Sequence, residues 1–370
     1  MPYIGNNPTD VPLTGSDLAD GIINSAKIAD GTIQKVDLAA GVGGTNYSGR
    51  NDIINGGLVV NQENQTAPAD DAYTIGDLFL HVGEGTPVMS LETDGPQGVR
   101  PWQKMVLDAN AQGGLVYFMS NDDVQDYIAN GKLSFGIQLK TTAATIANAR
   151  IGILKWTGTA DAVTSDVVGT WASDGTNPTL ATNWSYENTP ANLGLTTSWA
   201  RHTVEDVTVD SDTKNIAVFV WTDDGTITAS DVIGFSEWQM NPGATVNDFT
   251  QPSYTNTLSQ VHKLVERQDY DEANVQYIAT GTTFNATQHH GILYYVPKVK
   301  NPTVTTSGYL TFFLYDANGA GHALTSFPIT DITQDRCHYQ AAGITAANAG
   351  GGTLVRDATD TCWLLFDSRL

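Results

Sequence analysis

Hydrophobic and polar positions alternate along much of residues 50–250, and this alternation is the pattern of a β-protein. Short apolar runs follow one another between turns rich in Gly, Asn and Asp. We expect strands at 77–82, 88–92, 103–107, 115–119, 133–139, 151–156, 216–221 and 232–240. About ten strands in one span of this length predict a two-sheet jelly-roll sandwich over residues 50–250.

Two stretches of this span carry more specific local predictions. The run 216–221 (IAVFVW) is apolar at every position and predicts a central strand, and Asp223-Asp224-Gly225 after it predicts a hairpin turn. In 50–62 (RNDIINGGLVVNQ), the sequence Asn55-Gly56-Gly57 separates two apolar runs. A Gly pair within a strand pattern is typical of a bulge, so we expect a turn and then one bent strand that opens the domain.

Helical patterns are few. Residues 121–130 predict a short helix capped by Ser120 or Asn121, with acidic residues in its first turn. Residues 253–271 predict a second helix within a linker at 251–271, because apolar residues recur there at helical spacing: Leu258, Val261, Leu264 and Val265. Residues 272–370 are β-like again and predict a small C-terminal β-domain, with strands at 276–280, 291–297, 309–315, 337–340 and 361–366.

The first 45 residues contain an internal repeat. LADG at 18–21 recurs as IADG at 28–31 and LAAG at 38–41, and an apolar residue occupies every fifth position at Leu18, Ile23, Ile28, Ile33 and Leu38. A period of five fits neither a helix nor a strand. One chain cannot bury so thin a row on itself, so we expect identical chains to pack their rows together in an intertwined stalk. The alternative is a disordered linker rich in Gly and Asp.

Charge and composition narrow the function classes. The net charge is −22, from 40 acidic and 18 basic residues, which argues against binding nucleic acid or an anionic membrane through charge. The N-terminus lacks the basic and apolar regions of a signal peptide, and no apolar run approaches the roughly 18 residues that span a bilayer. We therefore expect synthesis in a cytoplasm and no membrane insertion.

Candidate chemistry is sparse. The motifs G-x-S-x-G and H-E-x-x-H, a P-loop and a dinucleotide fingerprint are all missing, so we predict no enzyme and no cofactor. Calcium stays open at 121–123 and 223–224, although turn and cap roles suit these acidic residues better. Neighbours in a strand point to opposite faces, so His289 and His290 cannot easily share one metal ion. A bridge between Cys337 and Cys362, the only two cysteines, also stays open.

Several segments carry a resemblance to a known family. MPYIGN at 1–6 and the repeats at 20–41 are similar to the start of many bacteriophage tail fibres. Residues 51–62 resemble the N-x-x-I-N-G-x-x-x-x-x-Q opening of a carbohydrate-binding-type jelly roll in phage tail-associated proteins, and 235–244 resemble its closing segment. The matching positions are Asn51, Ile54, Asn55, Gly56, Gln62, Gln239, Pro242 and Gly243, with Asp77 in a second motif at 73–79.

The resemblance implies a homotrimeric tail fibre of the virion. The N-terminal arm would attach to phage tail or baseplate proteins, and the β-domains would contact a bacterial surface polysaccharide or an outer-membrane receptor. Two rival functions are a structural baseplate or adaptor protein without receptor contact, and a glycan-depolymerising tailspike. The tailspike would need a groove with two carboxylates about 5 to 9.5 Å apart.

Tryptophans supply the candidate ligand-binding residues. Seven of the eight lie between 102 and 238, and several of these sit in or near a region rich in Gly, Ser, Thr and Asn. Sugar C–H faces stack on aromatic rings, while Asp, Asn and Gln bond sugar hydroxyls. We expect Trp171 and Trp184 on exposed loops as the leading glycan contacts, with Trp156 and Asp77 as further candidates. The alternative for each Trp is core packing.

Overall fold

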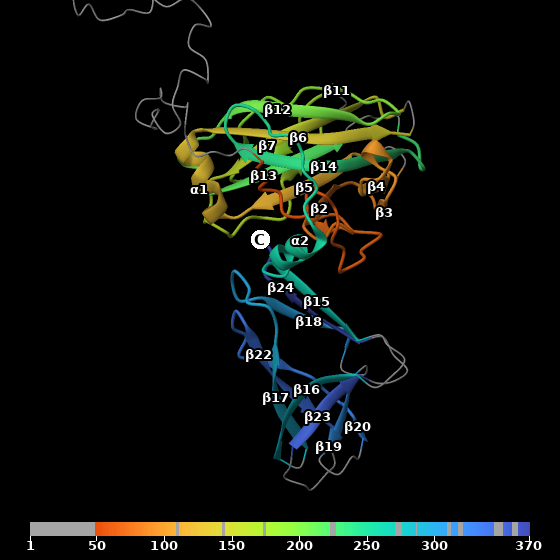
Figure 1. Ribbon diagram of the computed structural model, residues 1–370, viewed down its shortest axis with the longest axis vertical. Coiled ribbons are helices and arrows are strands. Elements are labelled where there is room, and N and C mark those ends of the chain that lie inside the picture. The colour runs from red at the N-terminus through yellow and green to blue at the C-terminus, as the bar shows by residue number, and fades with distance from the viewer. Residues whose placement is uncertain are drawn as a thin grey trace, which may run out of the picture. The chain divides into compact units, whose positions relative to one another are not determined.

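The computed structural model describes residues 49–108, 111–142, 145–172, 175–222, 227–270, 276–285, 287–308, 312–316, 321–343, 351–356 and 362–370. Gly49–Leu370 is one compact unit. It contains a β-sandwich and a C-terminal β-body, as the ribbon in Figure 1 shows. The stalk predicted for residues 1–45, with its row Leu18, Ile23, Ile28, Ile33 and Leu38, lies outside the described residues and stays a prediction.

The sandwich consists of two antiparallel sheets. Sheet A has the order β1 (Ala72–Tyr73), β2 (Phe79–Gly83), β5 (Gly113–Met119), β13 (Asn215–Thr222), β7 (Asn148–Trp156) and β10 (Trp184–Tyr186), with β11 (Leu193–Gly194) also paired to β7. Sheet B has the order β12 (Ala200–Thr208), β6 (Lys132–Thr141), β14 (Val232–Pro242), β4 (Trp102–Val106) and β3 (Val88–Glu92). The main hydrophobic core lies between these sheets.

The connections have jelly-roll character. The chain crosses from one sheet to the other between β2 and β3, β4 and β5, β5 and β6, β6 and β7, β11 and β12, β12 and β13, and β13 and β14. This repeated crossing wraps the strands around one core and confirms the predicted jelly-roll sandwich. The hairpin predicted after 216–221 is wrong, because β13 and β14 belong to different sheets. The turn residues predicted for it, 223–225, lie outside the described part of the chain.

Strand β13 is central, as predicted. It pairs with β5 on one side and β7 on the other, and all of its residues are buried. Ile216, Val218 and Val220 point into the core between the sheets. The alternate side chains Ala217, Phe219 and Trp221 join a second cluster on the outer side of sheet A. Burial on both faces is the reason for the continuous apolar run.

The stretch 50–62 is a buried turn, so the predicted bent strand is wrong. Asn55 has a left-handed backbone conformation, with φ of 60°, and its side chain is buried. Its amide group donates to the carbonyls of Val60 and Gly76 at 2.9 Å and accepts from the Val60 N–H at 3.0 Å. A Cβ on Gly56 would lie 2.3 Å from the Trp238 carbonyl oxygen. These local side-chain bonds replace the ladder of a strand.

The first helix agrees with the sequence and the second does so only in part. Helix α1 (Asn121–Asn130) begins after Ser120, whose hydroxyl accepts from the Asp123 N–H, and ends at Gly131 in the left-handed conformation. Helix α2 covers only Tyr254–Val261, and β15 (Val265–Tyr270) follows it. The helix predicted over 253–271 is therefore wrong beyond α2, because β15 pairs along its whole length with β24 (Cys362–Asp367).

Two further sheets build the C-terminal body. Sheet C has the order β15, β24 and β18 (Thr303–Thr306). Sheet D has the order β20 (Gly321–Ala323), β19 (Phe312–Asp316), β23 (Gly351–Arg356), β16 (Tyr277–Asn285), β17 (Gln288–Tyr294), β22 (Arg336–Ala342) and β21 (Ile329–Thr330). A separate hydrophobic core fills this body and contains Cys337 and Cys362, which are both buried and form no disulfide with each other.

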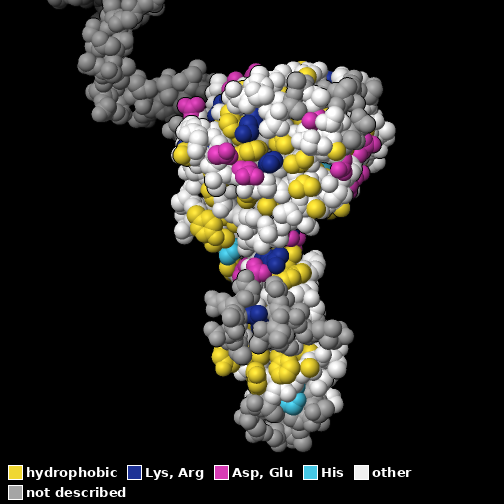
Figure 2. Space-filling model, turned by 90° about the vertical axis from the view of Figure 1, so that its right-hand side faces the viewer, with side chains coloured by type: hydrophobic (Ala, Val, Ile, Leu, Met, Phe, Trp, Pro, Cys, Tyr) yellow, Lys and Arg dark blue, Asp and Glu magenta, His cyan; other side chains and the backbone are white. Residues whose placement is uncertain are grey.

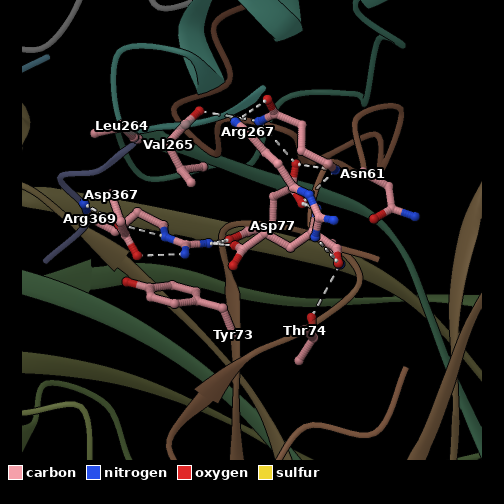
Figure 3. Close-up of polar contacts among 12 residues, drawn as sticks. Asn61, Tyr73, Thr74, Asp77, Leu264, Val265, Arg267, Asp367 and Arg369 are labelled. Carbon is pink, nitrogen blue, oxygen red and sulfur yellow. Dashed lines mark hydrogen bonds and ion pairs between the residues drawn. The ribbon is translucent and has the colours of Figure 1, made fainter. Parts of the chain in front are cut away.

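Polar contacts join the sandwich to the C-terminal body. Arg369 pairs with Asp367 at 2.6 Å, with Glu63, and with the Asp77 carbonyl. Its guanidinium lies 3.6 Å from the centre of the Tyr73 ring, an arrangement visible in Figure 3. Gln62 donates from its side chain to the Val265 carbonyl at 3.2 Å. None of the described helices is both long and apolar enough to span a membrane.

Candidate functional site

Trp156 and Trp184 lie in the core, so the expectation that Trp184 occupies an exposed loop is wrong. They belong to β7 and β10, are only 3% and 6% exposed, and their ring centres lie 5.1 Å apart. Each indole N–H has a partner, the Thr159 carbonyl for Trp156 and the Thr164 hydroxyl for Trp184. Rings enclosed in this way present no open face to a sugar, and they cover the outer side of sheet A instead.

Trp171 lies outside the strands and is half-buried, with its ring centre 6.0 Å from that of Phe219. One part of the ring packs on sheet A and another part reaches the surface. Its glycan-binding role stays a prediction.

Asp77 is fully buried and holds the backbone of the opening turn. Its carboxylate accepts from the N–H groups of Gln62 and Glu63, at 2.8 and 3.2 Å, and its backbone is left-handed. Burial raises the pKa of this carboxyl group above its ordinary value, although the two backbone bonds oppose the rise. Figure 3 shows Asp77 beside Arg369 at the junction. Its contacts are therefore those of a structural residue.

Asn121 and Asp123, two of the residues weighed for calcium, have local partners. Ser120 donates from its hydroxyl to Asp123 at 2.6 Å, and Asn121 donates from its side chain to the Lys214 carbonyl. Residues 223–224 lie outside the described residues. Within the ranges that the structure describes, no group of three or more His, Cys, Asp or Glu side chains is placed to hold a metal ion.

Exposed aromatic side chains gather on sheet D, away from the predicted loops. Tyr277, Phe284, Ile292 and Tyr294 are 75%, 71%, 43% and 65% exposed. They make up half of the eight large exposed hydrophobic residues found in the described ranges, and all lie on the paired strands β16 and β17. Figure 2 shows hydrophobic side chains at the surface of the C-terminal body. Such a concentration of exposed apolar surface is typical of a binding surface.

Register defines the side of the sheet on which these residues lie. His290 is opposite Thr282, Ile292 is opposite His338, and Thr280 is opposite Thr353. Directly opposed residues of an antiparallel pair point to the same side, so these side chains share the outer side of sheet D. Together with Tyr277 and Tyr294 they line a shallow, open depression of about 750 Å³. We call this surface the aromatic face.

Glycines allow the sheet beneath the aromatic face to pack closely. Gly281 and Gly291 are paired with each other across β16 and β17. A Cβ on Gly291 would lie 2.5 Å from the Tyr339 hydroxyl, and one on Gly281 would lie 2.7 Å from the His289 ring. Glycine at these positions therefore lets two buried rings lie against the strands from the core side.

The histidines of β17 point to opposite sides, as the strand period predicts. His289 is buried in the body and stacks on Tyr339, while His290 stacks on Phe284 with ring centres 4.7 Å apart. The His338 ring lies edge-on to His290 at 5.1 Å. Burial, and then the neighbouring His338, lower the pKa of His290 below its ordinary value. The lowered pKa favours the uncharged imidazole of His290 at neutral pH.

The depression offers flat rings, hydroxyl groups and imidazole nitrogens, and none of its lining residues is an acid, a lysine or an arginine. Aromatic rings with neutral hydrogen-bonding groups suit an uncharged polyhydroxylated ligand. The sequence contains one signal for this surface. In 291–295 (GILYY) apolar residues occupy both faces of a strand in a small domain. One face can pack on the core of the domain, so the other face presents apolar side chains at the surface unless another segment covers it.

Comparisons with known proteins give similarities of fold alone. No protein-family model matches the sequence, and no curated protein matches it. Among solved structures, TmCBM61 in complex with β-1,4-galactotriose is 12% identical, with a TM-score of 0.30, over 52% of this chain and 99% of that chain. The CBM22-1 xylan-binding domain of Xyn10C from Paenibacillus barcinonensis is 10% identical, with a TM-score of 0.28, over 50% and 96%.

A third similar structure is the family 11 carbohydrate-binding module of Lic26A-Cel5E from Clostridium thermocellum. It is 11% identical, with a TM-score of 0.26, over 45% of this chain and 88% of that chain. All three are carbohydrate-binding modules. TM-scores this low do not indicate which ligand this chain binds.

Proposed function

We propose that this protein is a tail-fibre-type attachment protein that binds envelope glycans of a bacterial cell through the aromatic face. The observation that carries the proposal is the exposure of Tyr277, Phe284 and Tyr294 beside threonine and histidine side chains on one side of sheet D. Exposed rings on a rigid sheet are available for sugar stacking without any rearrangement of the fold.

The N-terminal repeat supports a multivalent form of this function. Three chains joined through the row Leu18, Ile23, Ile28, Ile33 and Leu38 would present three aromatic faces, and the segment before it would hold the fibre to the phage tail. Linked sites bind a surface far more durably than single ones, since each rebinding step is intramolecular. In this proposal the protein acts on the virion tail after synthesis in the host cytoplasm, and it requires neither a cofactor nor catalysis.

Binding of the full-length protein to bacterial cells and to their purified surface polysaccharide tests the proposal. We expect Tyr294→Ala and Tyr277→Ala each to weaken binding by roughly tenfold, because each removes one stacking ring. Tyr254→Ala is the matched control, since Tyr254 is also an exposed tyrosine but lies on α2. Periodate oxidation of the glycans should abolish binding, whereas protease treatment of the cells should not. Binding that survives periodate and both sheet D variants would contradict the proposal.

A structural adaptor of the tail is the second candidate, and one observation favours it. Trp156 and Trp184, two of the candidate glycan contacts, are buried, so the sandwich lacks these two aromatic contacts. In an adaptor the aromatic face would contact another tail protein. Under this alternative, the wild-type protein would not bind glycans. The variants Tyr277→Ala and Tyr294→Ala would instead impair incorporation of the protein into tails.

A further inference from the structure

We propose that the aromatic face binds the interior of an uncharged, linear glycan chain that lies along β16 and β17. This inference rests on the proposed function and specifies the chemical class of its ligand. It combines three properties of the face, which are its charge, its shape and the placing of its rings.

Charge is the first property. The depression has no Asp, Glu, Lys or Arg in its lining, and burial lowers the pKa of His290, one of its two histidines, which favours the uncharged imidazole. The cation closest in register is Arg336, which lies opposite Tyr294, and the Asp335 carboxylate is 3.9 Å from it. The whole chain carries a net charge of −22. An anionic sugar would therefore meet no free cation in the depression and would be repelled at long range.

Shape is the second property. The depression is shallow and open, and its lining comes from four neighbouring strands of one sheet, β16, β17, β22 and β23. Recognition of a chain end requires an enclosed pocket that stops the chain, and among the residues that the structure describes the lining forms no such wall. A polymer can therefore cross the face and continue on both sides.

The placing of the rings is the third property. Phe284 stacks on His290 at one end of the face, and Tyr294 lies four residues further along β17. At the strand rise this separation is roughly 13 Å, which is the length of roughly two to three sugar rings. Thr280, Thr282 and Thr353 line the depression between these ends. The two ends would stack on different sugars of one chain, while the threonine hydroxyls bond those between them.

An affinity series with the full-length protein tests this inference. The probes are linear neutral polysaccharides (dextran, mannan and galactan), their oligosaccharides of increasing length, and the anionic polymers alginate and polygalacturonate. For the neutral polymer that binds, we expect affinity to rise by roughly tenfold between the disaccharide and the tetrasaccharide and then to level off, because the second ring cluster is then engaged. Chemical capping of both chain ends should leave binding of the polymer unchanged.

Variants separate the two ends of the face. Phe284→Ala should remove the gain between the disaccharide and the tetrasaccharide, and Val88→Ala, a change at an exposed apolar position on β3, should preserve it. Loss of binding on end-capping, equal affinity for a monosaccharide, or preference for the anionic polymers would overturn this inference while glycan attachment remains. Absence of binding to every glycan tested, including the host polysaccharide, would overturn the proposed function itself.

Discussion

At the scale of single residues, short polar side chains shape the backbone wherever the alternating pattern stops. Asn55 fixes the opening turn through three hydrogen bonds of its side chain. The Asp77 carboxylate accepts from the N–H groups of Gln62 and Glu63 at the end of this turn. Asn55 and Asp77 both have a positive φ, a conformation that Asn and Asp tolerate better than other residues with a side chain. Both residues match positions of the family motif, and their contacts stabilise the fold.

Asp71 gives a pH-dependent prediction at this scale. Burial, together with the nearby Asp70 and Asp166 carboxylates, raises its pKa from 3.8 to about 6. The folded protein thus binds this proton more tightly than the unfolded chain, and the contribution of Asp71 to stability is lost as pH rises through about 6. Asp71→Asn should raise the unfolding temperature at pH 7 by roughly 1–3 °C, after allowance for solvent screening, and leave it unchanged near pH 4.

Thermal unfolding of the two proteins between pH 4 and pH 7.5 measures this difference. Asn tolerates the positive φ of position 71, so the substitution adds no backbone strain. Glu84→Gln, at an exposed position, is the matched control for loss of one carboxylate. A difference between Asp71→Asn and wild type that stays constant with pH would contradict the assignment.

At the scale of elements, the segment after β7 acts as a cover for the outer side of sheet A. The strands β8 (Val168–Thr170) and β9 (Thr179–Leu180) bring Val168 and Leu180 onto the cluster that contains Phe219 and Trp221, beside Trp184 of the sheet A strand β10. This cover explains why β13 is apolar on both faces. It also explains why tryptophans in a segment of loop-like composition are buried.

Truncation of the covering tryptophans tests this packing. Trp184→Ala should lower the free energy of unfolding by about 3–5 kcal/mol, because it opens a large cavity against sheet A. Trp171→Ala should cost about half as much, since only part of that ring is buried. Urea denaturation followed by circular dichroism measures both values. Equal and small losses for the two variants would argue that the cover packs loosely and that the rings serve another purpose.

At the scale of the molecule, the last residues of the chain join the two parts of the compact unit. Arg369 contacts Glu63 and Tyr73 of the sandwich while β24 belongs to the C-terminal body, and the C-terminus is drawn beside α2 in Figure 1. Lys298 and Glu266 form a buried pair 2.8 Å apart. Glu266 lies on β15, and the Lys298 ammonium also donates to the carbonyl of His262, the residue that follows α2. The junction thus depends on charged groups that are mostly shielded from water.

Removal of the Arg369 side chain should uncouple the two parts. Arg369→Met leaves the carboxylates of Glu63 and Asp367 without their cation, at a cost of roughly 2–4 kcal/mol. We expect wild type to unfold in one calorimetric transition and this variant to show an earlier transition of the C-terminal body. Arg336→Met, which removes an exposed arginine from the same body, is the control and should keep one transition. A single transition in both variants would show that apolar contacts alone couple the parts.

The sequence by itself determined the features that depend on neighbouring residues. The strand alternation, the two-sided burial of β13, a cap of α1 at Ser120 or Asn121 and the opposite directions of His289 and His290 all follow from local period and side-chain chemistry. The jelly-roll class follows from the number and length of the runs.

Only the tertiary structure decided the features that depend on distant partners. The pairing of β15 with β24 turned half of a predicted helix into a strand, and the cover on sheet A buried Trp156 and Trp184. The aromatic face exists because β16 and β17 lie together at the surface of sheet D with nothing in the described chain packed over Tyr277 and Tyr294. Strand pairing and burial depend on contacts between residues far apart in the sequence. A local pattern does not encode which distant segment packs against a given strand.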